Sequence, residues 1–222
     1  MSDHVPVLDQ VDPDPTGSAT PRKHPRQDRA RETVTAIVQA GAELIVELGY
    51  AGATTNKIAK RAGVSIGSLY QYFPNKDAIF LALFQQHQAA VRQIIANCQT
   101  QFDDPGIPLA ETLRALFSNL VELHEINPRL NQALVQELPQ PEQMEIKCQA
   151  ENQAYIEQLE ATLRRRPDVN RQNLEIAAHL LVRTTGAIAR WLGHEAPPEL
   201  DKREIIDETV AMLAGYILGS HS

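Results

Sequence analysis

The chain has 222 residues and a formal net charge of −7, and 43% of its residues are hydrophobic. This length suits one small and one medium domain, since domains commonly run to about 100–200 residues. The sequence has no run of about 18 apolar residues and no apolar stretch of the secretory type near its start, so we expect neither a membrane protein nor a secreted one. Cys98 and Cys148 lack C-x-x-C spacing and fit a reducing cytoplasm.

A disordered leader is predicted for residues 1–27, which are rich in Pro, Asp and Thr and carry few large apolar side chains. Basic residues gather at its end, at Arg22, Lys23 and Arg26. They suit either a DNA groove or a solvated tail.

Helical patterns follow the leader. A first helix is expected from about Asp28 to Leu48, with Gly49 as its stop. Thr54 or Thr55 can then cap a short helix that ends at Gly63, a glycine suited to a tight turn with positive φ.

Ser65 can cap a second short helix, which Phe73-Pro74 closes. Asn75 can cap a longer helix from Lys76 to about Thr100. Prolines then separate five further patterns, at about 109–126, 129–138, 142–166, 171–193 and 199–218. Arg164–Arg166 is expected to lie in solvent at the end of one of them.

The predicted fold is therefore all-α with about nine helices. A three-helix N-terminal domain over residues 28–74 contains a helix-turn-helix, and a larger helical domain covers residues 75–222. Two short helices joined by a glycine turn form a unit whose second helix enters the DNA major groove. Residues 22–77 hold nine Lys or Arg against five acids, so the positive charge lies on the part that would meet phosphates.

Residues 54–80, TTNKIAKRAGVSIGSLYQYFPNKDAIF, carry this pattern. From roughly Arg29 to Leu83 the sequence resembles the N-terminal domain of the TetR (tetracycline repressor) family of transcriptional regulators. The resemblance implies binding to double-stranded DNA by Thr54, Thr55, Asn56, Ser65, Ile66, Gly67, Ser68, Tyr70, Gln71, Tyr72 and Lys76.

Individual roles follow from side-chain chemistry. Gln71 can pair with adenine, and Ile66 can contact a thymine methyl group. Asn56 suits a base or a phosphate equally, and the two tyrosines suit phosphate contact or simple packing.

The resemblance also implies a homodimer that reads a palindromic operator, because one short reading helix binds weakly alone. The last two helices are the expected interface, with internal packing as the alternative. The expected interface residues are Thr185, Ala189, Ile206, Val210, Leu213 and Ile217.

Relatives bind a small-molecule effector among the middle helices, and its identity is not readable from this sequence. Candidate contacts are apolar residues with a few polar groups, although core packing explains each of them as well. They are Phe84, His87, Phe117, Leu120, His124, Met144, Cys148, Tyr155 and Arg183.

Enzymatic readings have little support. Gly63–Gly67 matches G-x-S-x-G, but a nucleophile elbow needs a preceding strand, and the residues before it read as helix. His124-Glu125 begins an H-E-x-x-H pattern whose fifth position is Pro128, so we expect no metal site and no cofactor. The expected function is a cytoplasmic, ligand-responsive repressor, with an activator or a ligand-independent DNA-binding protein as the alternative.

Overall fold

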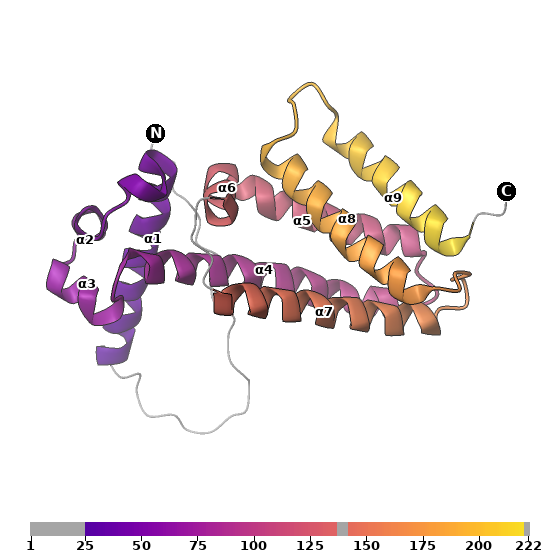
Figure 1. Cartoon of the computed structure of the whole chain (residues 1–222), viewed down its shortest axis with the longest axis horizontal. Coiled ribbons are helices and arrows are strands. Elements are labelled where there is room, and N and C mark those ends of the chain that lie inside the picture. Colours follow the sequence, from indigo (N-terminus) through magenta and orange to yellow (C-terminus); the bar gives the residue numbers. More distant parts are fainter. Residues whose placement is uncertain (1–24, 137–141, 220–222) are drawn as a thin grey trace. The chain divides into compact units, whose positions relative to one another are not determined.

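A computed structural model describes residues 25–136 and 142–219, with side chains for 28–134 and 148–219. The predicted all-α class is confirmed, because these residues form nine helices and no strand (Figure 1). The helices are α1 Pro25–Gly52, α2 Thr55–Ala62, α3 Ile66–Tyr72, α4 Lys76–Asp103, α5 Leu109–Ile126, α6 Pro128–Gln136, α7 Glu142–Arg165, α8 Leu174–His194 and α9 Lys202–Leu218. Most of the predicted leader, with Arg22 and Lys23, lies outside the described residues.

The described chain divides into two compact units, and one division falls inside α4. The first unit holds α1, α2, α3, the part of α4 up to Ala89, and α6 from Arg129; the second holds the rest of α4 with α5, α7, α8 and α9. The domain boundary expected from the sequence lies earlier, at residue 74. The start of α4 belongs with the first unit because Ile79 and Phe80 are fully buried there, against Gly41 of α1.

The core of the first unit joins α1 to the two short helices and the start of α4. Ile37, Ile45, Ile58 and Leu69 are at most 2% exposed. Residues 28–52, within α1, are long and apolar enough to cross a membrane by length and composition, so the expectation of no such segment was too strict. Core helices pass the same test, and Ile37, Val38, Leu44 and Ile45 of α1 are buried in the unit, whereas Leu48 is 45% exposed.

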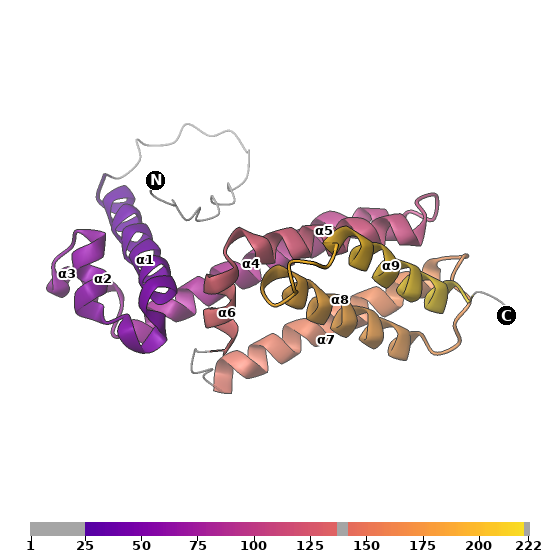
Figure 2. The same ribbon diagram turned by 90° about the horizontal axis from the view of Figure 1, so that it is seen from above.

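The core of the second unit is built around α5. Helix α8 packs against α5 and α7, and α9 packs against α5 (Figure 2). Their facing sides bury Phe117, Leu181, Leu192, Leu213 and Ile217 in one cluster. These helices bury one apolar stripe each, which is how amphipathic helices form a core.

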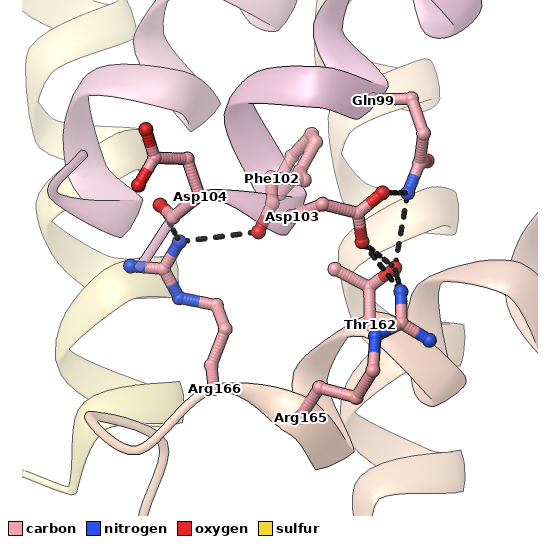
Figure 3. Close-up of polar contacts among 7 residues, drawn as sticks. All are labelled: Gln99, Phe102, Asp103, Asp104, Thr162, Arg165 and Arg166. Carbon is pink, nitrogen blue, oxygen red and sulfur yellow. Dashed lines mark hydrogen bonds and ion pairs between the residues drawn. The ribbon is translucent and has the colours of Figure 1, made fainter. Parts of the chain in front are cut away.

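A buried arginine ties the end of α7 to the end of α4 within the second unit. The Arg166 side chain is 2% exposed. Its guanidinium donates to the carbonyl oxygens of Phe102 and Asp104 at 3.2 Å (Figure 3). It also donates to the carbonyl oxygen of Ile107 at 2.8 Å. It also donates to both carboxylate oxygens of Asp168, at 2.9 and 2.8 Å. The expectation that this arginine lies in solvent was therefore wrong, since it satisfies carbonyls at the end of a neighbouring helix.

Candidate nucleic-acid interface

The helix-turn-helix is built by the local capping that the sequence predicts. The Thr54 hydroxyl accepts from the Lys57 N–H at 3.4 Å and caps α2. Gly63 adopts the left-handed conformation with φ 70°, which a glycine adopts at little steric cost. The Ser65 hydroxyl accepts from the Ser68 N–H at 3.0 Å and caps α3. Three local features, the caps Thr54 and Ser65 and the glycine at position 63, therefore specify the two helices and the turn between them.

Two fully buried side chains, Ile58 of α2 and Leu69 of α3, attach the short helices to the core. Their outer side is polar and solvent-accessible. Of the residues expected to contact DNA, eight are exposed and three are half-buried, the latter being Thr55, Ser68 and Lys76. The exposed eight are Thr54, Asn56, Ser65, Ile66, Gly67, Tyr70, Gln71 and Tyr72.

Hydroxyl groups on this surface are held in pairs. Thr55 Oγ1 lies 3.2 Å from the Tyr70 hydroxyl, which links the start of α2 to the middle of α3. Ser65 Oγ lies 2.8 Å from Ser68 Oγ. Tyr70 keeps half of its surface in solvent, at 51% exposure, so its hydroxyl is oriented without being covered. Such hydroxyls can donate to phosphate oxygens.

Acidic side chains of α1 neutralise one of the basic residues of α2. The Arg61 guanidinium pairs with both carboxylate oxygens of Glu47 at 2.8 Å and with Glu43 at 3.0 Å. The hydrogen bond from Arg61 lowers the pKa of Glu47 below its usual value. Lys57 is also engaged, since its ammonium donates to the Gly52 carbonyl at 2.9 Å.

Tyr50 connects the end of α1 with the start of α4, a role that no sequence pattern indicated. The Lys76 ammonium donates to the Tyr50 carbonyl at 2.8 Å and lies 3.8 Å from the centre of its ring. The Tyr50 hydroxyl donates to Asp77, and burial, followed by this bond, raises the pKa of Tyr50 to about 12. The lysine amine expected at a phosphate is thus turned toward Tyr50. Asn75 caps α4 as predicted, accepting from the Ala78 N–H at 2.9 Å.

The side chains proposed to bind an effector are spread over both units. Phe84 is buried and His87 half-buried in the first unit. In the second unit Phe117, Leu120 and His124 are buried in α5, Cys148 and Tyr155 are half-buried in α7, and Arg183 is exposed on α8. The Met144 side chain lies outside the described residues. Among the residues that the structure describes, no group of three or more His, Cys, Asp and Glu side chains could hold a metal ion.

The expected dimer surface requires a correction. Five of its six residues are buried within their own chain, and only Ile206 is half-buried. The buried five are Thr185, Ala189, Val210, Leu213 and Ile217, each at most 5% exposed. A side chain that its own core covers offers no surface to a partner, so internal packing accounts for these residues.

Two family models match the chain, one over each part of the fold. Residues 37–83 match bacterial regulatory proteins of the tetR family, and residues 108–217 match the tetracyclin repressor-like C-terminal domain. An uncharacterised HTH-type transcriptional regulator of Mycobacterium tuberculosis is 34% identical over 93 residues, which cover 40% of this chain and 46% of that protein. The fatty acid metabolism regulator protein of Bacillus subtilis is 46% identical over 50 residues, 22% of this chain and 26% of that protein. The chain therefore matches less than half the length of these relatives.

Solved structures share the fold over nearly the whole chain. NalD, the secondary repressor of the MexAB-OprM multidrug efflux pump in Pseudomonas aeruginosa, superposes with a TM-score of 0.61 at 21% identity. The superposition covers 87% of this chain and all of that one. Helix-turn-helix geometry, both family models and this likeness agree, and the chain belongs to the TetR family of bacterial transcriptional regulators.

Proposed function

We propose that the chain is a cytoplasmic, dimeric transcriptional repressor that binds a palindromic operator and is released by a small molecule. The observation that carries this proposal is the exposed polar side of α2 and α3, whose apolar anchors Ile58 and Leu69 are fully buried. A surface in which the anchors are hidden and the hydroxyl, amide and backbone groups are displayed suits the DNA major groove.

Base reading is assigned to α3 and its entry. Gln71 can make two hydrogen bonds to an adenine, and Ile66, 38% exposed, can contact a thymine methyl group. Gly67 has no side chain to hold the helix away from the bases. Thr55 and Tyr70 would share one phosphate through their paired hydroxyls.

We call the α2–α3 surface of one copy its reading head. A second copy would supply the second reading head for a palindrome, about 34–36 Å from the first. We assign the dimer surface to the outward sides of α8 and α9. Helix α8 displays an outward stripe of Ile176, Leu180, Arg183, Ala187 and Arg190, and α9 displays one of Glu204, Glu208 and Met212. Both stripes carry apolar groups, and the charged residues are basic on α8 and acidic on α9. In a two-fold dimer the α8 stripe of one copy would face the α9 stripe of the other, so opposite charges would meet.

The effector would act on the second unit. Phe117 and Leu120 on α5, with Tyr155 on α7, favour a hydrophobic or mixed ligand over a small polar metabolite. The name of the Bacillus relative gives no ligand class here, since 50 matched residues are too few to span both units. A ligand would lower operator affinity only by binding better to a state whose heads no longer fit the groove spacing.

The test begins with a footprint on the DNA immediately upstream of this protein's own gene. A two-fold symmetric protected site supports the proposal. Binding is then measured by fluorescence anisotropy on that site and on a scrambled duplex. Gln71→Ala should weaken the specific complex by about tenfold or more, from the loss of one base contact per head. Gln85→Ala, at an exposed glutamine of α4, is the matched control and should leave affinity unchanged.

Equal affinity of the intact chain for the site and the scrambled duplex would contradict the proposal. Deleting the gene separates repressor from activator, because transcripts of a repressor's targets should rise and those of an activator's targets should fall.

A further inference from the structure

The reading head has fewer available positive charges than its sequence suggests. Between Thr54 and Lys76 the chain has four cationic side chains. Three of them are engaged within the protein: Lys57 with the Gly52 carbonyl, Arg61 with two glutamates, and Lys76 with Tyr50. Lys60 is exposed, and among the described residues no acceptor engages its ammonium.

Helical spacing separates these side chains on α2. Residues four apart share one side of a helix, so Lys57 and Arg61 form one flank and Asn56 and Lys60 form another. The first flank contacts the end and middle of α1. The second flank lies next to Thr55, whose hydroxyl meets Tyr70 of α3. Within the described part of the chain, Lys60 is therefore an unengaged cation on the same side of α2 as an exposed candidate DNA contact.

We infer that Lys60 is the phosphate-neutralising cation of α2, and that Arg61, one residue later, contributes almost none of its charge to DNA. This inference rests on the proposed function. The charge of Arg61 is balanced by Glu43 and Glu47, whereas Lys57 and Lys76 bond to neutral carbonyl oxygens and keep their charge. A cation already paired with carboxylates adds little to counterion release, so affinity would depend on salt less steeply than the four cations imply.

The experiment compares Lys60→Gln with Arg61→Gln, which remove one positive charge each from adjacent positions of one helix. Operator affinity of the full chain is measured by anisotropy from about 50 to about 200 mM KCl, on the footprinted site and on a scrambled duplex. Lys60→Gln should weaken both complexes by a similar factor and reduce the slope of log K against log salt by about 0.9 per reading head. Arg61→Gln should change the slope by less than half as much.

A second variant tests the same inference in the opposite direction and does not depend on the Arg61 substitution leaving α2 folded. Glu43→Gln with Glu47→Gln releases the Arg61 guanidinium, and should tighten binding to both duplexes and steepen the salt dependence. Equal slopes for Lys60→Gln and Arg61→Gln, or no steepening in the double variant, would overturn the inference and leave the proposed function standing. Failure of the unmodified chain to bind either duplex at the lowest salt would overturn the proposed function itself.

Discussion

Replacing Arg166 with methionine removes the guanidinium that closes the end of α4 and keeps most of the volume of the side-chain stem. The substitution leaves the Phe102 carbonyl buried without its donor and takes the paired charge away from Asp168. Breaking a buried ion pair by removing one partner costs about 3–5 kcal/mol. The Asp168 side chain is 37% exposed and can regain water, so we expect a loss near the lower end, about 3 kcal/mol.

Arg165→Met is the matched control, since this neighbouring arginine is 61% exposed and pairs with Asp103 at the surface. Exposed pairs contribute about 1 kcal/mol or less. The chain has a single tryptophan, Trp191, which packs against the core of the second unit, so its fluorescence reports unfolding of the unit that holds both arginines.

Urea unfolding followed by Trp191 fluorescence measures the difference between the two variants. A loss of about 3 kcal/mol corresponds to a fall in Tm of about 6–12 °C for a domain of 150–250 residues. A free energy of unfolding for Arg166→Met within about 1 kcal/mol of that for Arg165→Met would refute the view that the buried guanidinium holds the end of α4.

Three further predictions follow from contacts described above. Tyr50→Phe and Asp77→Asn should each lower the free energy of unfolding by about 1 kcal/mol, and the double variant should lose no more than either, in a thermal-unfolding cycle. Leu213→Glu should lower the free energy of unfolding by about 4 kcal/mol and unfold the second unit, which circular dichroism would detect. Met212→Glu, at a 57% exposed position, should stay folded and sediment as a monomer. A folded, monomeric Leu213→Glu variant would restore the interface expected from the sequence. The Arg-bonded Asp168 has a pKa lowered from 3.8, so its stabilising contribution should be complete above about pH 4 and disappear as acid titrates it below that value; unfolding curves at successive pH values measure this loss.

The reading head could be predicted from the sequence because its determinants are local. The caps Thr54 and Ser65, the turn at Gly63 and the stop at Pro74 each act within a few residues, and the helix bounds follow from them. The fold class was accessible for the same reason, since prolines and helical stripes mark most of the other helices.

The dimer surface was not predictable in this way. An apolar stripe identifies the side of a helix that is covered, but it does not say whether the helix's own chain or a partner covers it. Thr185 and Ala189 of α8, which suggested a contact between copies, are buried within their own chain. The bonds of Arg166 to three carbonyl oxygens and of the Tyr50 hydroxyl to Asp77 could not be predicted, because these partners lie 27 to 64 residues away along the sequence.

The passage of the chain between its units inside α4, at Ala89, has a consequence for recombining such proteins. The junction at this point is a continuous helix rather than a flexible linker, so a chimera that exchanges reading heads must be spliced within it. One inserted or deleted residue would turn the remaining residues of α4 by about 100° around the helix axis and move its buried side chains out of register with the core. Exchanges that keep the residue count of α4 constant should therefore keep the buried side of this helix intact on both sides of the splice.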